Sequence, residues 1–105
     1  MDINDLRQLY ANGVYHWTDH ILVRMIQKGI SENDIESVLM DGEIIEEYPS
    51  DYPYPSCLVI GRNTISDILH VVCGIGDNSL WLITAYYPSQ DKWDDGYKTR
   101  KGRIL

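Results

Sequence analysis

The sequence predicts an α+β fold, in which N-terminal helices pack on an antiparallel sheet of about four strands. Two observations predict this fold class. Apolar residues recur at helical spacing before Gly42, whereas β-branched and aromatic residues separated by Pro, Asn and Gly dominate after it. The length of 105 residues suits one hydrophobic core, so we expect a single domain over residues 1–105.

Three helices are expected in the first half of the chain. A short helix is predicted within Asp2–Gly13, and a more strongly amphipathic one within Thr18–Gly29, where Thr and Gly are typical capping residues. A third helix is expected within Ser31–Gly42, because Ser31-x-x-Asp34 resembles a capping box with Asp in place of Glu. The two later helices follow each other across a tight glycine turn.

Four strands are expected in the second half, at residues 43–48, 57–62, 69–75 and 80–87. The segment Pro49–Ser56 contains three prolines and is therefore predicted to be a stiff loop. Residues 63–68 and 76–79 are expected to form hairpin turns, so neighbouring strands should be antiparallel. The tail from residue 92 carries Trp93 and Tyr97 among charged residues, which leaves both packing across the sheet and a loose tail open.

Composition excludes several classes of protein. The apolar runs are far shorter than the roughly 20 residues that span a bilayer, and the acidic N-terminus is unlike a signal peptide, so we expect a cytoplasmic protein. Cys57 and Cys73 lie in separate strand-like runs without paired spacing and are expected to be buried free thiols. The net charge of -7 argues against broad nonspecific binding to nucleic acid.

Charge is unevenly distributed along the chain. Half of the 16 acidic residues lie between Glu32 and Asp51, a stretch without Lys or Arg. Basic residues instead gather at the C-terminus. This polarity suits a basic working surface with an acidic back, or a simple basic tail. The candidate RNA-binding residues are Lys98, Arg100, Lys101 and Arg103.

His20 and Arg24 are the first candidates for chemistry. They are four residues apart on a predicted helix, so both side chains lie on one face. An imidazole can exchange a proton near pH 7, and a guanidinium can bind phosphate oxygens with two parallel hydrogen bonds. The alternative is that His20 covers the helix surface and Arg24 pairs with a nearby carboxylate.

The predicted strands supply three further candidates. Strand alternation places His70, Val72 and Gly74 on one face of their strand. The same alternation places Leu80, Leu82, Thr84 and Tyr86 together on the next strand. If His70 shares a side with Thr84 or Tyr86, a polar cluster forms, although strand histidines and tyrosines are commonly ordinary packing.

We expect neither a metal nor a cofactor. His16 and His20 would share a helical face only if the helix extended back past Thr18, and a third ligand is not evident. Gly74-Ile75-Gly76 lacks the third glycine and the following helix of a phosphate-binding loop.

Several blocks of the sequence, taken in order, resemble the domain of unknown function 4258 family. The blocks are His20-x-x-x-Arg24-Met25-x-x-x-Gly29-Ile30, Gly42-Glu43-Ile44-Ile45-Glu46, Tyr48-Pro49-x-Asp51-x-Pro53-Tyr54-Pro55-Ser56-Cys57-Leu58, Leu69-His70-Val71-Val72 and Ile83-Thr84-x-Tyr86-x-Pro88. The similarity covers about residues 16–100. Its Tyr-Pro-Ser-Cys-Leu block is rather specific.

The resemblance implies a fold and activity similar to those of small RelE-like toxins, which are ribonucleases with helices followed by an antiparallel sheet. It also implies a partner, because members are associated with small zinc-finger antitoxin-like proteins. The residues that match the family pattern and carry chemistry are His20, Arg24, His70, Thr84 and Tyr86. The sequence departs from the pattern at Ile68, where proline is usual, and at Tyr87, where an acid is usual. The second departure puts in doubt any mechanism that needs a carboxylate there.

Two hypotheses stay open. In the first, the chain is a toxin of RelE-like architecture that cleaves RNA without metal, with His20 or His70 as acid or base, Arg24 at the phosphate, and Tyr86 or Thr84 positioning it. In the second, the same surface holds a small partner protein without catalysis, and the acidic stretch is the docking face. The basic C-terminus favours the first hypothesis, and the overall acidity favours the second.

Overall fold

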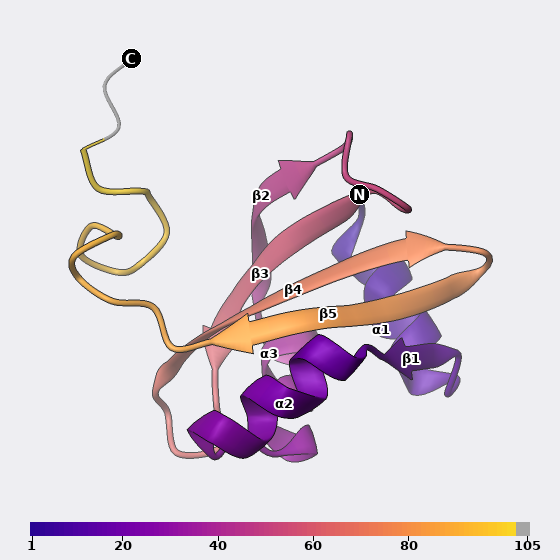
Figure 1. Cartoon of the computed structure of the whole chain (residues 1–105), viewed down its shortest axis with the longest axis horizontal. Helices are drawn as coiled ribbons and strands as arrows, with labels where there is room; N and C mark the ends of the chain where they lie inside the picture. Colours follow the sequence, from indigo (N-terminus) through magenta and orange to yellow (C-terminus); the bar gives the residue numbers. More distant parts are fainter. Residues whose placement is uncertain (103–105) are drawn as a thin grey trace.

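The computed structural model describes residues 1–102 and contains helices on either side of a short strand, followed by four longer strands (Figure 1). The elements in order are α1 (Ile3–Ala11), β1 (Tyr15–Trp17), α2 (Asp19–Lys28), α3 (Glu32–Asp41), β2 (Glu43–Tyr48), β3 (Ser56–Arg62), β4 (Ile68–Gly76) and β5 (Ser79–Tyr86). The predicted α+β class is therefore confirmed. In the described residues, no helix is both long and apolar enough to cross a membrane.

The five strands form one mixed sheet in the order β1-β5-β4-β3-β2. The four longer strands are antiparallel neighbours, as the short connections predicted. Asp77 and Asn78 both have positive φ at the β4–β5 turn, which is the conformation of a tight two-residue hairpin. β1 was not predicted, and it adds parallel to β5 at the edge of the sheet.

The helix termini follow the capping residues in the sequence. The Thr18 side chain accepts a hydrogen bond from the backbone of Ile21, and α2 ends at Gly29 in a left-handed conformation. Ser31 and Asp34 form the expected capping box at the start of α3. The first helix is capped by Asp2, whose side chain accepts a hydrogen bond from the Asn4 backbone N–H.

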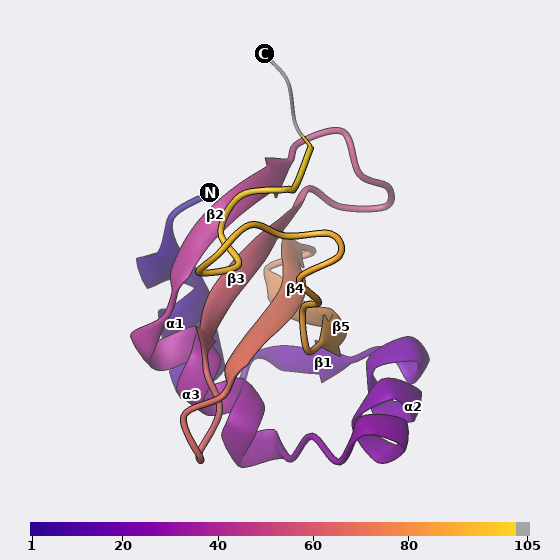
Figure 2. The same cartoon turned by 90° about the vertical axis from the view of Figure 1, so that its left-hand side faces the viewer.

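The hydrophobic core lies between the helices and one face of the sheet. α1 and α3 lie on one side of the sheet, α2 lies along β5, and the C-terminal tail crosses the opposite face (Figure 2). Ile21 of α2 and Leu39 of α3 are completely buried in the same core. Cys57 and Cys73 face each other across β3 and β4 as buried free thiols, with 4.0 Å between their sulfur atoms.

The C-terminal tail is packed on the sheet. Trp93 is only 3% exposed, and its backbone forms a bridge with Arg100. A short hydrogen-bonded loop connects these two residues, with the Asp94 backbone N–H donating to the Thr99 carbonyl oxygen at 2.8 Å. Of the two alternatives for the tail, the described part of it therefore takes the packed one.

Candidate functional site

A cavity of about 430 Å³ lies between α2, the end of β5 and the C-terminal tail. It collects four of the five residues predicted to carry chemistry, which are His20, Arg24, Thr84 and Tyr86. The tail contributes further residues from the other side. The remaining lining residues are Tyr87, Pro88, Ser89, Lys92, Trp93 and Arg100.

α2 presents His20 and Arg24 to the cavity from one helical face. The helix is fixed to the sheet at its first turn, because the Thr18 hydroxyl donates to the Ile83 carbonyl oxygen at 2.8 Å. The Thr18 backbone N–H also donates to the Leu82 carbonyl oxygen at 3.1 Å. One residue therefore caps the helix and ties it to β5, which places His20 beside the strand.

A β-bulge in β5 determines which of its side chains reach the cavity. Strand pairing runs from Val72↔Thr84 directly to Cys73↔Leu82, so Ile83 is an extra residue. Leu82 packs in the core, whereas Thr84 and Tyr86 line the cavity. The prediction that Leu80, Leu82, Thr84 and Tyr86 share one face was therefore wrong, because the bulge interrupts simple alternation.

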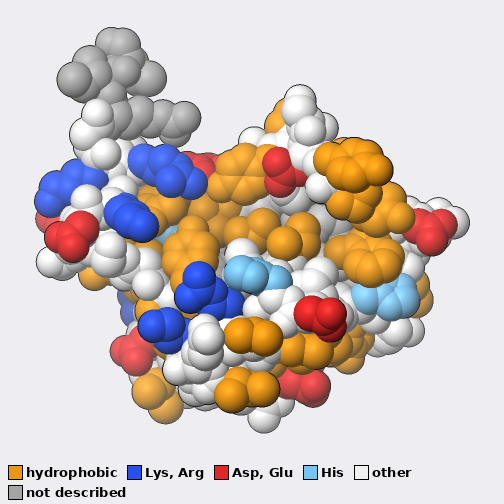
Figure 3. Space-filling model, viewed as in Figure 1, with side chains coloured by type: hydrophobic (Ala, Val, Ile, Leu, Met, Phe, Trp, Pro, Cys, Tyr) orange, Lys and Arg blue, Asp and Glu red, His pale blue; other side chains and the backbone are white. Residues whose placement is uncertain are grey.

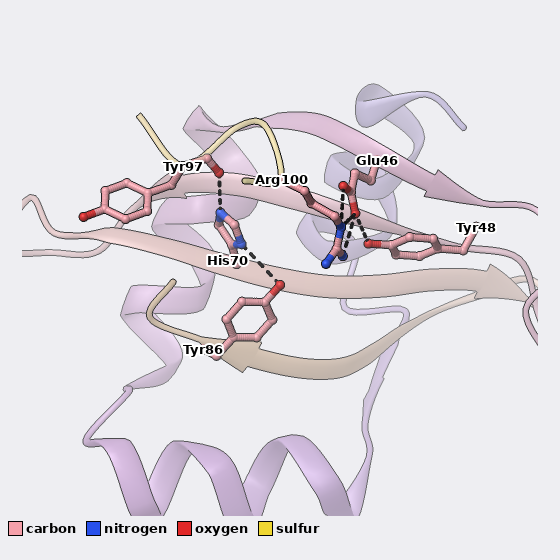
Figure 4. Close-up of polar contacts among 6 residues, drawn as sticks. All are labelled: Glu46, Tyr48, His70, Tyr86, Tyr97 and Arg100. Atoms are coloured by element: carbon pink, nitrogen blue, oxygen red, sulfur yellow. Dashed lines mark hydrogen bonds and ion pairs between the residues drawn. The ribbon is translucent and has the colours of Figure 1, made fainter. Parts of the chain in front are cut away.

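His70 lies beneath the cavity and does not line it. Its side chain is fully buried, and both ring nitrogens are engaged (Figure 4). The Tyr97 carbonyl oxygen lies 2.9 Å from Nε2 and can only accept, so Nε2 carries the proton. Burial lowers the pKa of His70, which favours the neutral ring. Nδ1 is then the acceptor for the Tyr86 hydroxyl at 3.3 Å.

This arrangement argues against His70 as the acid or base, one of the two alternatives in the first hypothesis, because His70 does not line the cavity that His20 lines. A buried neutral imidazole with both nitrogens occupied can orient Tyr86 but cannot contact a substrate directly. Burial also raises the pKa of Tyr86, so its hydroxyl keeps its proton at neutral pH. The Tyr86 oxygen that lines the cavity is therefore a neutral hydroxyl held by a neutral histidine.

Trp93 and Arg100 form the tail side of the cavity. The Trp93 ring packs edge-on against His70, with 4.6 Å between ring centroids, and the Arg100 guanidinium lies 4.7 Å from the Trp93 ring centroid. Arg100 also binds both carboxylate oxygens of Glu46 on β2, at 2.9 Å from Nε to Oε2 and from Nη2 to Oε1 (Figure 4). That carboxylate raises the pKa of Arg100 further. Tyr48 donates to the same carboxylate at 2.5 Å, and burial raises the pKa of Tyr48 to about 12.

The predicted RNA-binding residues of the tail are largely held by the protein itself. Lys98 forms an ion pair with Glu43 at 2.6 Å, Arg100 is bound to Glu46, and the Lys101 ammonium donates to the Gln90 carbonyl oxygen at 3.3 Å. Arg103 lies outside the described residues. The basic tail and the acidic stretch of the sequence are thus joined at β2. Of the three described tail residues predicted to bind RNA, only Arg100 lines the cavity.

Lys92 is a cavity residue that the sequence argument did not single out. Its position depends on the tail folding back, because the Lys101 backbone N–H donates to the Lys92 carbonyl oxygen at 2.8 Å. Figure 3 shows Lys and Arg side chains gathered on one side of this face and hydrophobic side chains on the other, with histidine between them. In the sequence, the one indication that the tail folds back onto the sheet was the presence of Trp93 among charged residues.

Other parts of the described chain offer less chemistry. A larger hollow of about 730 Å³ lies between α3, β3 and the tail loop. The charged side chains in its wall are already engaged within the protein, because Glu43 pairs with Lys98 and Arg62 donates to the Ser66 carbonyl oxygen. His16 lies on β1, outside α2, and stacks on Trp81. Within residues 1–102, no group of three or more His, Cys, Asp or Glu side chains is arranged to hold a metal ion.

Comparison with known proteins identifies the family. A search of curated proteins and a search of solved structures each found no significant match. A family model described as a domain of unknown function, DUF4258, matches residues 17–87, which is more than half of the chain but ends before the tail. The match begins close to the expected residue 16 but ends well before the expected residue 100. It includes all five residues predicted to carry chemistry, which are His20, Arg24, His70, Thr84 and Tyr86. The chain therefore belongs to the DUF4258 family.

Proposed function

We propose that this domain is an endoribonuclease that cleaves single-stranded RNA at the cavity between α2, β5 and the tail. The observation that carries the proposal is the joint presence of His20, Arg24, Thr84 and Tyr86 in one cavity with Lys92. Such a set contains a group for proton transfer, two cations for a phosphate and two hydroxyls that donate hydrogen bonds.

The reaction that suits these groups is attack by the ribose 2′-hydroxyl on the neighbouring phosphate. His20, which is exposed at the cavity, takes the 2′ proton as a new bond forms between the 2′-oxygen and phosphorus. Arg24 binds the non-bridging oxygens, whose charge grows in the transition state. The bond from phosphorus to the 5′-oxygen breaks, and the Lys92 ammonium supplies the proton to that oxygen. The products are a 2′,3′-cyclic phosphate and a 5′-hydroxyl.

Tyr86 and Thr84 have positioning roles in this scheme. The Tyr86 hydroxyl is held by His70 from below, which fixes its oxygen at the cavity surface. His70 therefore acts through Tyr86 instead of exchanging a proton with RNA. Thr84 lies two residues earlier on the same face of β5 and adds a second hydroxyl.

The test is cleavage of a 5′-labelled, unstructured RNA by purified protein in the presence of EDTA. We expect wild-type protein to produce fragments that end in a 2′,3′-cyclic phosphate, and His20→Ala and Arg24→Met to lower the rate by at least 100-fold. Gln27→Ala is a matched control at an exposed position of α2 and should retain the wild-type rate. Folded wild-type protein that leaves RNA intact would exclude the proposal.

A second candidate function is noncatalytic docking of a small partner protein. The observation in its favour is an apolar patch on the outer side of α2, made by Leu22, Val23 and Ile26, of which Ile26 is 84% exposed. Apolar side chains grouped in this way are typical of interaction surfaces. This second function is compatible with the toxin hypothesis, because a zinc-finger antitoxin-like partner bound to α2 would lie beside His20 and Arg24.

Growth experiments separate the two functions. If expression of the chain arrests growth, His20→Ala should relieve the arrest while the far-UV circular dichroism spectrum stays unchanged. Ile26→Asp should instead abolish partner binding and leave RNA cleavage intact. Binding of a partner without any cleavage by the wild type would support the docking function alone.

A further inference from the structure

A second cavity, of about 410 Å³, adjoins the first on the same face of the sheet. It lies between the proline-rich loop, β4, β5 and the start of α2. The lining residues are Thr18, Asp51, Tyr52, Pro53, Tyr54, Gly74, Trp81 and Ile83. Among these described residues, three are aromatic and only Asp51 is charged. The cavity is therefore an aromatic pocket with one carboxylate.

The rings of Trp81 and Tyr54 are held by contacts within the protein. The Trp81 indole N–H donates to the Gly76 carbonyl oxygen at 3.0 Å, which satisfies its polar group. His16 stacks on Trp81 with 4.4 Å between ring centroids, and Tyr54 lies 5.7 Å away at an interplanar angle of 31°. Rings that are already ordered lose little conformational entropy when a flat ligand packs against them.

Glycines in β4 allow the loop to approach the sheet so closely. A Cβ atom at Gly76 would lie 2.0 Å from the Tyr54 ring, and one at Gly74 would lie 2.7 Å from the Pro55 carbonyl oxygen. Both contacts are too short for any side chain. The Gly74 backbone thus forms part of the pocket wall.

The β5 bulge joins the pocket to the cavity of the proposed ribonuclease. Ile83 lines the pocket and Thr84, the next residue, lines the cavity. Likewise Thr18 lines the pocket and His20 lines the cavity. Residues that are adjacent or nearly adjacent along the chain therefore line the two hollows, which makes the hollows neighbours on this face.

We propose that the aromatic pocket binds an unpaired guanine base of the RNA whose phosphate lies at Arg24. This inference rests on the proposed function and adds a base preference to it. Stacking on aromatic rings accepts any base, whereas hydrogen bonds to the Asp51 carboxylate discriminate between bases. Guanine presents two parallel N–H donors on its Watson–Crick edge, which match a carboxylate, whereas adenine presents one donor beside an acceptor. The buried Ser56 hydroxyl donates to Asp51 Oδ2, which holds the carboxylate in place.

Residue-resolved NMR titration tests the pocket without requiring catalysis. Guanosine, adenosine, cytidine and uridine 5′-monophosphates are titrated into ¹⁵N-labelled protein, with inorganic phosphate as a separate control. We expect guanosine monophosphate to shift the Gly74 amide and the Trp81 indole signals most strongly and with the lowest Kd. Asp51→Asn should raise that Kd about tenfold and change the Kd of the adenine nucleotide little. Trp81→Ala should abolish the shift of the Gly74 amide. Tyr52→Ala provides a second variant at a 96% exposed position, which should weaken binding without altering the fold.

Failure of this inference differs from failure of the proposed function. Guanosine monophosphate that shifts Gly74 and Trp81 without any RNA cleavage would support the pocket and exclude the ribonuclease. RNA cleavage without base preference, unchanged in Asp51→Asn and Tyr52→Ala, would exclude the pocket and support the ribonuclease. A proline-rich or aromatic peptide that shifts these signals when none of the four nucleotides does would overturn the proposal in favour of a protein ligand.

Discussion

Replacement of Trp93 by alanine should detach the C-terminal tail from the sheet. The Trp93 side chain is 3% exposed and packs against His70 on one side and Arg100 on another. A buried aromatic side chain removes about 150–250 Å² from water, and at about 25 cal/mol per Å² this corresponds to roughly 4–6 kcal/mol as an upper bound. A tail can move away and leave no void, so the lower end of the usual range for Trp→Ala applies. We expect a loss of about 3 kcal/mol.

Urea unfolding followed by far-UV circular dichroism measures this loss, since that signal does not depend on tryptophan fluorescence. A loss of this size corresponds to a Tm lower by about 12 °C or more for a chain of this length. Tyr52→Ala is the matched control, because Tyr52 is 96% exposed, and it should change stability by less than about 0.5 kcal/mol. A loss below about 1 kcal/mol for Trp93→Ala would refute the packing of the tail.

A double-mutant cycle with Arg100→Met isolates the contact between the two tail residues. Arg100 lies over the Trp93 ring and binds Glu46 in a bidentate manner. The single Arg100→Met change should cost about 1 kcal/mol, since the Arg100 side chain is about half exposed to solvent. The coupling energy with Trp93→Ala should be about 0.5–1 kcal/mol from the cation–π contact. Strict additivity would show that the two side chains stabilise the tail independently.

Three further predictions concern single side chains. Burial lowers the pKa of His70, so the unfolded protein binds more protons than the folded protein as the pH falls below about 6.5. The free energy of unfolding should therefore be lower at pH 5.0 than at pH 7.5, as measured by the urea midpoints. His70→Gln should reduce this difference in stability between the two pH values. Tyr86→Phe removes the hydroxyl held by His70 and should lower RNA cleavage about tenfold, measured as initial rate, for a stability loss of about 1 kcal/mol. Burial raises the pKa of Asp34, but hydrogen bonds from Ser31 and Thr64 outweigh it and lower the pKa overall, so its stabilisation is present above about pH 3.9 and lost as pH falls through the folded-state pKa. Asp34→Ala should cost about 3 kcal/mol at pH 7 by thermal unfolding and flatten the acid limb of the stability profile.

The elements that local residues determine were predictable from the sequence. Thr18 and Gly29 delimit α2 because a side-chain cap and a left-handed glycine act within one turn of the helix. The Ser31 capping box is equally local. The expected strands differ from β2–β5 by at most one residue at either end, since turn residues and β-branched runs delimit them.

The features that depend on distant partners were not predictable in the same way. β1 is only three residues long and pairs in parallel with β5, more than 60 residues later, so its strand character comes from the partner and not from its own pattern. The bulge at Ile83 interrupts an alternation that reads as regular in the sequence. The sequence left open whether His70 and Tyr86 share a side of the sheet. They do, but the burial of His70 depends on Trp93, which lies on the tail.

The candidate site is built from residues within the family match and from tail residues that lie beyond it. The region that matches the DUF4258 family, residues 17–87, supplies His20, Arg24, Thr84 and Tyr86. The tail beyond it supplies Lys92 and covers His70 with Trp93. The tail is attached through Arg100 to Glu46 on β2, the strand at the opposite edge of the sheet from β1. Because Glu43 and Glu46 of the acidic stretch pair with Lys98 and Arg100 of the basic tail, the uneven charge of the sequence attaches the tail to the sheet beside the cavity. Cations outside these pairs, Arg24 and Lys92, are therefore the ones that the proposed function assigns to an RNA phosphate.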